Sequence, residues 1–402
     1  MRLNSDEKNA LTVWFGGILS DASISQYGVS KDIELEELDQ QLVAKLKKIA
    51  DNGDVYQLVS DLIIRDIVSR IDEKLPDGWT KISDLKNQPD TFTIAQNVVS
   101  KLSKLPKEHI ILMRASKLLS KETSNITIDH PLTNRFGIIS SNIAKKKYYL
   151  SNPHEPLSQY IWSHNDIESK NFADDHLYFY YRIKSAIFDK YQSQFVSEFL
   201  NEVRSFYGAC LAHRVLFGYI EKPDIHPLVL CFDFKDGFIE SVNNSDTDIQ
   251  NATYFESVGR PAFFRKTERF LDSIRQVTAF FACNSPRLKT AAMWLLRAQM
   301  SNRNMDRVLE AAIALEVLLG DRAMADRMGL TKLMATRCAY AIGENQKERD
   351  ELYKFFTEFY SLRSDIVHTG KINDTDREEV LTWESIELVR RLIVHEQNME
   401  LC

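Results

Sequence analysis

The C-terminal part of this chain contains one stretch that indicates its fold, Leu352-Tyr353-Lys354-Phe355-Phe356-Thr357-Glu358-Phe359-Tyr360-Ser361-Leu362-Arg363-Ser364-Asp365-Ile366-Val367-His368-Thr369-Gly370-Lys371. At ~100° per residue, its apolar residues form one stripe of a helix, and Arg363 lies in the middle of that stripe. The stripe consists of Leu352, Phe355, Phe356, Phe359, Arg363 and Ile366. A guanidinium is rarely buried without a partner, so Arg363 requires an acid, a subunit interface or an anionic ligand.

Further helices are predicted around this segment. Pro286 suits the first turn of a helix, and Gly320, Gly343 and Gly370 each stand where a helix end accepts a left-handed residue. The expected helices cover about 287–301, 304–319, 329–343, 346–369 and 375–397. Short connections between them indicate antiparallel neighbours, and therefore an up-and-down bundle.

The rest of the chain has a different character. Residues 1–125 are predicted to be mainly helical, and residues 126–260 to mix helices with strands. Two apolar runs near 228–242 flank Lys235-Asp236-Gly237, a strong signal for a β-hairpin turn. The expected class is α+β, in which the mixed region precedes an all-α bundle at 261–402.

Composition limits the class of protein. The 402 residues are 44% hydrophobic, which excludes a disordered chain, and a formal charge of -6 disfavours wrapping nucleic acid around the whole surface. A local basic site is compatible with that charge. Five scattered cysteines exclude a disulfide framework and disfavour structural zinc. No apolar run spans a bilayer and the N-terminus is charged, so we expect a cytoplasmic protein without membrane contact.

His368 follows Arg363 by five residues, which places the two side chains ~140° apart on an ideal helix. Unwinding at Val367–Thr369, before Gly370, would let the imidazole turn toward the arginine. Alternatively, two copies of the helix meet across a two-fold axis, and each site draws on both chains. A cation in the last helical turn also favours the helix dipole, which accounts for His368 but not for an arginine on the apolar stripe.

The run Arg363-Ser364-Asp365-Ile366-Val367-His368 resembles the Arg-(four to six residues)-His motif of HEPN domains (higher eukaryotes and prokaryotes nucleotide-binding). The pattern is most similar to the Apea-like branch, since Ala314–Leu319 and Thr336–Ala339 precede the motif in the same order. The resemblance covers about residues 286–400.

This resemblance implies a helical bundle that forms a homodimer, with the motif in a cleft at the dimer interface. It also implies a metal-independent endoribonuclease of toxin or anti-phage defence systems, acting on RNA without a cofactor. His368 would serve as general acid/base and Arg363 would bind the phosphate and stabilise its developing charge. Ser364 would orient the phosphate or the histidine. The N-terminal region would be a sensor that responds to a trigger or a regulatory partner.

Glu316 interrupts an otherwise apolar run, so its carboxylate is expected to be paired. An acid recurs at this place in the Apea-like pattern, and Arg337 is the expected partner in a structural ion pair. The alternative is that Glu316 supports Arg363 directly, and Arg337 has the same two interpretations.

Two other functions stay open. A catalytically inactive HEPN protein would act as a dimerisation or RNA-binding module. A metal-dependent nuclease would use Asp224, Asp233 and Lys235, because Pro-Asp followed by Asp-x-Lys is a pattern whose carboxylates hold magnesium while the lysine assists a water. The short gap between the two acids weighs against this nuclease.

Overall fold

The structure is a computed structural model and is mostly helical, with an antiparallel sheet and a C-terminal helical bundle. It describes residues 3–25, 28–29, 38–49, 55–68, 78–85, 90–105, 107–115, 127–148, 177–185, 194–216, 228–233, 239–243, 271–272, 274–321, 323, 326, 329–373 and 375–401. This arrangement agrees with the α+β class expected from the sequence.

The N-terminal residues form a unit with its own hydrophobic core. Its described elements are α1 (Ser5–Asp21), β1 (Ser23–Ser25), β2 (Gly28–Val29), α2 (Gln40–Ile49), α3 (Val55–Val68), β3 (Thr80–Lys81), the 3-10 helix η2 (Ile82–Asp84) and α4 (Thr91–Leu102). A capping box starts α1, because Asn4 Oδ1 accepts from the Glu7 backbone N–H and Glu7 Oε2 accepts from the Asn4 backbone N–H, each at 2.9 Å. Leu11 and Phe15 of α1 are fully buried in this core.

A larger antiparallel sheet follows in the order β5-β6-β7-β4-β8-β9. Its strands are β4 (Lys107–Arg114), β5 (Asp129–Pro131), β6 (Phe136–Ser140), β7 (Leu177–Ser185), β8 (Leu228–Asp233) and β9 (Ile239–Asn243), and α6 (Ser141–Tyr148) follows β6. Strands β8 and β9 pair antiparallel, which confirms the predicted hairpin.

The predicted boundary between residues 125 and 126 is wrong. Strand β4 lies before it, yet pairs with both β7 and β8 in the middle of the sheet. Its run Ile110–Met113 is fully buried. A strand that is buried on both faces lacks the alternation of polar and apolar residues by which a strand is recognised.

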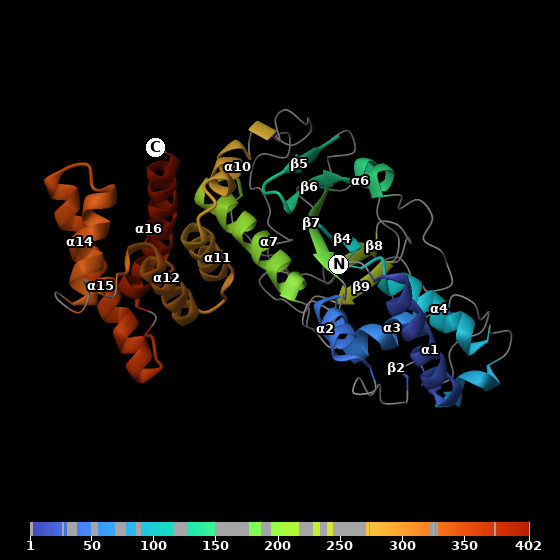
Figure 1. Cartoon of the computed structure of the whole chain (residues 1–402). Helices are drawn as coiled ribbons and strands as arrows, with labels where there is room; N and C mark the ends of the chain where they lie inside the picture. The colour runs from blue at the N-terminus through green and yellow to red at the C-terminus, as the bar shows by residue number, and fades with distance from the viewer. Residues whose placement is uncertain are drawn as a thin grey trace.

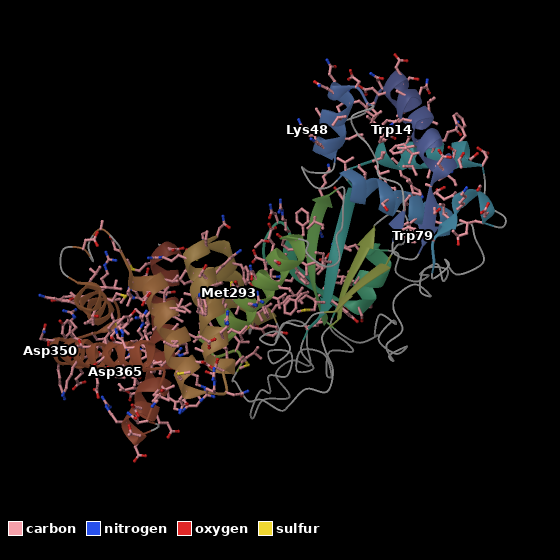
Figure 2. The ribbon with its side chains drawn as sticks, turned by 90° about the horizontal axis from the view of Figure 1, so that it is seen from below. Trp14, Lys48, Trp79, Met293, Asp350 and Asp365 are labelled. Carbon is pink, nitrogen blue, oxygen red and sulfur yellow. The ribbon has the colours of Figure 1, made fainter. Side chains whose placement is uncertain are left out.

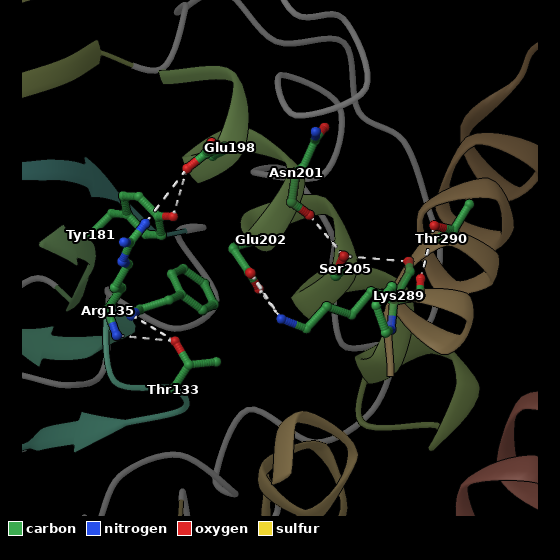
Figure 3. A network of polar contacts seen from close by, with 11 residues as sticks. Thr133, Arg135, Tyr181, Glu198, Asn201, Glu202, Ser205, Lys289 and Thr290 are labelled. Atoms are coloured by element: carbon green, nitrogen blue, oxygen red, sulfur yellow. Dashed lines mark hydrogen bonds and ion pairs between the residues drawn. The ribbon is translucent and has the colours of Figure 1, made fainter. Parts of the chain in front are cut away.

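Helix α7 (Gln194–Ala212) joins the sheet to the C-terminal helices, and Figure 1 shows it between β7 and α11. On the sheet side, the Phe206 ring meets Phe179 edge-on at 5.0 Å. On the other side, Lys289 of α11 pairs with Glu202 at 2.8 Å and its carbonyl accepts from Ser205 at 3.3 Å (Figure 3). The sheet and the bundle share one core, so the predicted boundary at 260/261 does not separate two cores.

The bundle helices begin and end close to the predicted residues. They are α11 (Pro286–Met300), α12 (Asn304–Leu319), α14 (Leu330–Ile342), α15 (Gln346–Thr369) and α16 (Asp376–Leu401). Helix α10 (Arg275–Ala282) precedes them and was not among the expected helices. Gly370 has the predicted left-handed conformation, with φ of 67°. Gly320 and Gly343 do not, since their φ angles are -68° and -85°. A Cβ at either position would instead overlap the carbonyl of Glu316 or Ala339, so lack of space, and not a left-handed backbone, restricts these sites to glycine.

The N-terminal unit and the bundle lie at opposite ends of the molecule. Figure 2 shows Trp14 and Trp79 at one end, Asp350 and Asp365 of α15 at the other, and Met293 of α11 between them. Of the helices that the structure describes, none combines the length and the apolarity that crossing a membrane requires.

Candidate functional site

Helix α15 carries the Arg-(four)-His motif and has a well-defined cap at each end. At the start of the helix, the Asn345 side chain accepts a hydrogen bond of 3.0 Å from the Glu348 backbone N–H. At the end of the helix, the Gly370 N–H donates a hydrogen bond of 2.8 Å to the Ile366 carbonyl. The buried face comprises Leu352, Phe356, Phe359, Tyr360, Leu362 and Ile366. The helix therefore runs without interruption past both motif residues.

Arg363 meets the acid that an arginine on an apolar stripe requires. Its Nη2 lies 3.3 Å from Oε1 of Glu316, which α12 places one turn from its C-terminus. The same oxygen accepts from the Tyr360 hydroxyl at 2.9 Å. Tyr360 and Arg363 are three residues apart, so they lie close enough on α15 to reach the same carboxylate.

Burial differs sharply within this cluster. Tyr360 is buried at 6% exposure, whereas the side chains of Arg363 and Glu316 are 34% and 32% exposed. Burial raises the pKa of the Tyr360 phenol, and the charge of Glu316 together with their hydrogen bond raises this pKa further. Tyr360 therefore stays protonated and donates, while the arginine beside it reaches solvent.

The guanidinium of Arg363 has unused hydrogen-bond donors. An arginine has five N–H donors, and among the described residues only one of those of Arg363 is engaged. Arg390 of α16 is different, because its Nε donates to Glu387 at 2.7 Å and its Nη1 to the Ala212 carbonyl at 3.0 Å, while Nη2 also contacts Glu387. All three nitrogens of Arg390 have a partner within the protein, whereas Arg363 keeps most of its donors free among the described residues.

The prediction that Arg337 pairs with Glu316 is wrong. Arg337 of α14 donates to the Leu319 carbonyl at 2.8 Å and to Asp321 at 3.2 Å. It thus binds the C-terminus of α12, where backbone carbonyls lack partners and the helix dipole favours a cation. Glu316 pairs with Arg363 instead, which was the alternative that the sequence left open.

His368 and Ser364 do not join this cluster in one chain. Helix α15 continues through Thr369, so it does not unwind at residues 367–369 as one hypothesis required. His368 is exposed, and it lies ~140° around the helix and about 7.5 Å along its axis from Arg363. Among the described residues, neither the His368 nor the half-buried Ser364 side chain has a hydrogen bond.

The metal-dependent alternative gains no support. Asp224 and Lys235 lie outside the described residues, and Asp233 ends β8. In the part of the chain that the structure describes, no three His, Cys, Asp or Glu side chains come together as a metal site.

Tyr360 is the site residue that sequence reasoning missed. A signal was present, since Tyr360 stands beside the apolar stripe one turn before Arg363, and a phenol that is buried there needs an acceptor. Met334 of α14 completes its surroundings, with its sulfur 3.7 Å from the hydroxyl.

No protein-family model, curated protein or solved structure matches this chain.

Proposed function

We propose that this protein is a metal-independent endoribonuclease of HEPN type. The observation that carries the proposal is the state of Arg363, a cation anchored through one contact at 3.3 Å, 34% exposed, with its other donors free among the described residues. A planar guanidinium in that state can contact two oxygens of a phosphate. The local chemistry therefore suits a phosphodiester ligand.

His368 would supply the proton transfers. An imidazole takes the proton from the ribose 2′-hydroxyl, O2′ attacks phosphorus, and the P–O5′ bond breaks as an imidazolium protonates the leaving 5′-oxygen. Arg363 would stabilise the charge that develops on the two remaining phosphate oxygens. The products are a 2′,3′-cyclic phosphate and a free 5′-hydroxyl.

The unbroken helix favours a site made by two chains. Since α15 holds Arg363 and His368 apart, His368 of the partner subunit would complete the site around each Arg363. Val367, one turn after Arg363, is 54% exposed, so the last turn presents an apolar side chain next to the imidazole. A second copy is favoured by the separation of Arg363 and His368 on one unbroken helix.

The test is RNA cleavage by purified protein in EDTA. His368→Ala is expected to lower the rate roughly 10²–10⁴-fold, and Arg363→Ala roughly 10²–10³-fold. Asp365→Ala, an exposed change between them on the same helix, is the matched control and should leave the rate unchanged. Full activity of His368→Ala would overturn the proposal.

Mixing the two inactive variants tests the shared site. In a mixed dimer one site combines Arg363 from one chain with His368 from the other, so activity should return to about a quarter of the wild-type level after subunit exchange. A site made within one chain would give no recovery.

A second candidate is a catalytically inactive RNA-binding module. This function requires only the exposed Arg363 with its free donors, and does not require His368 to reach it. RNA binding that Arg363→Ala weakens and His368→Ala does not, with no cleavage under any condition, would select this function.

A further inference from the structure

Two arginines of α15 differ from the other arginines of helices α14–α16. Among the described residues, Arg349 contacts only the Gly343 carbonyl, at 3.1 Å, and Arg363 contacts only Glu316, at 3.3 Å. The others each contact two or more acceptor atoms, and they are Arg337, Arg377, Arg390 and Arg391. Arg349 therefore keeps most of its N–H donors free, as Arg363 does.

The two guanidinium groups lie toward the same side of α15. Arg349 and Arg363 are fourteen residues apart, which corresponds to ~21 Å along the helix axis and to only ~40° around it. Helix α14 packs on this side, antiparallel to α15, because Arg349 covers the Tyr340 ring while Tyr360 meets Met334. Arg349 thus stands at the C-terminal end of α14, and Arg363 stands toward its N-terminal end.

Arg349 also holds an exposed aromatic ring. Its guanidinium carbon lies 4.8 Å from the centroid of the Tyr340 ring, and Tyr340 is 65% exposed. A Cβ at Gly343 would lie 2.6 Å from Cγ of Arg349, so the glycine leaves room for the arginine stem. The arginine is fixed at its stem and at its Nε, and the ring beside it reaches solvent. Aromatic rings and guanidinium groups in such a setting stack on nucleobases.

The charge of α14 suits a polyanion. The helix contains no acidic residue, and its exposed Lys332 lies about two turns before Tyr340. Glu348, which precedes Arg349 in the sequence, pairs with Arg391 at 3.0 Å and leaves Arg349 unneutralised. Cations that alternate with an exposed aromatic ring are the features by which proteins bind single-stranded nucleic acid.

We infer that a single-stranded RNA runs along α14, with one phosphate on Arg363, another on Arg349, and a base stacked on Tyr340. The inference rests on the proposed function, because Arg363 marks the phosphate that is cleaved. It specifies the substrate as a single strand longer than a dinucleotide. Bases in a duplex are stacked on each other and are not free to reach Tyr340.

The length dependence of cleavage tests this inference. A dinucleotide reaches only Arg363, whereas a long single strand also reaches Tyr340 and Arg349. In Tyr340→Ala, the ratio of kcat/KM for the long strand to that for the dinucleotide should fall roughly 5–100-fold, the size of one lost stacking contact. Tyr340→Phe keeps the ring and should keep most of this ratio. Arg349→Gln should lower the salt dependence of RNA binding by about one phosphate contact.

Trp383 of α16 provides the matched control. Its ring is 42% exposed and lies 4.5 Å from the guanidinium carbon of Arg307, so it is also an exposed ring beside an arginine. Arg307, however, donates to the Ser301 carbonyl at 2.8 Å and to Asn304 at 3.4 Å. Trp383→Ala should therefore leave the ratio unchanged.

The outcomes separate this inference from the proposed function. Wild-type protein that cleaves the dinucleotide and the long strand equally well, or a ratio that Tyr340→Ala leaves unchanged, would overturn the inference and leave the proposed function standing. If no RNA is cleaved, the proposed function fails, and fluorescence anisotropy with a single-stranded oligonucleotide that lacks 2′-hydroxyls still tests the strand site. Binding that Tyr340→Ala weakens and Trp383→Ala does not would support that site, and binding that neither change affects, or no binding at all, would overturn it.

Discussion

Replacement of Glu316 by alanine tests whether the cluster on α15 also stabilises the bundle. The change removes the acceptor of both the Tyr360 hydroxyl and the Arg363 guanidinium. Glutamine at the same position removes the charge but keeps an oxygen that the phenol can donate to. The two variants therefore separate the hydrogen bond from the ion pair.

The expected loss follows from burial. A buried hydroxyl without its acceptor costs about 1–3 kcal/mol, and we expect the lower half of that range because the Met334 sulfur at 3.7 Å remains as a weak acceptor. The ion pair adds only about 0.2–1 kcal/mol, since its side chains are 34% and 32% exposed. Glu316→Ala should thus lower the free energy of unfolding by roughly 1–3 kcal/mol, and Glu316→Gln by about 1 kcal/mol or less.

Differential scanning calorimetry measures these changes. At about 2–4 °C per kcal/mol, Glu316→Ala should lower the Tm of the sheet-and-bundle core by roughly 2–12 °C. The N-terminal unit has a separate core and serves as an internal control, because any transition that it shows should not move. Equal effects of the alanine and glutamine variants would refute the reasoning, since the phenol would then gain nothing from its acceptor.

Three further predictions concern the fold. Gly370 has a left-handed φ of 67°, so Gly370→Ala should lower the free energy of unfolding, measured by urea titration, by about 1–2 kcal/mol. Gly17 lies in a helix with open space around an added Cβ, so Gly17→Ala should raise the free energy of unfolding by about 0.5–1 kcal/mol. Gly208→Ala should destabilise the shared core by about 3 kcal/mol or more, because the added Cβ overlaps the Ala292 carbonyl, and an unchanged Tm would contradict the close approach. Burial lowers the pKa of His213 from 6.5, so the unfolded chain binds more protons and stability should decrease as the pH falls below about 6.5. The same titration of His213→Gln should be flatter between about pH 7.5 and 5.5, and an equal slope would show that another group is responsible.

The helices of the bundle were predictable because their limits depend on local chemistry. Pro286 and Gly370 mark a helix start and a helix end through backbone restrictions that act within one turn. The hairpin of β8 and β9 was predictable for the same reason, since an Asp-Gly step between two apolar runs suffices to indicate it. Each signal needs only a few neighbouring residues.

The partner of Glu316 was not predictable, because two arginines compete for it and the choice depends on packing. In the structure the free carbonyls at the end of α12 take Arg337, which leaves Glu316 to Arg363. The shared core was also hidden, because α7 and α11 are far apart in sequence, and only the folded chain brings Gly208 against Ala292. Long-range contacts of this kind have no local sequence signal.

The anchoring of Arg363 and its exposure have one physical origin. The apolar stripe keeps α15 packed as far as Tyr360 and Ile366, while Val367 and His368 beside them on the last turn face solvent. Arg363 thus lies where the packed bundle gives way to water, close enough to the core to be held by Glu316 and far enough out to meet a ligand. A cation placed deeper would be satisfied within the protein, as Arg390 is, and one placed further out would lack a fixed position. A phosphate site requires both conditions, which is why the position of this arginine, more than its presence in a motif, supports the proposed function.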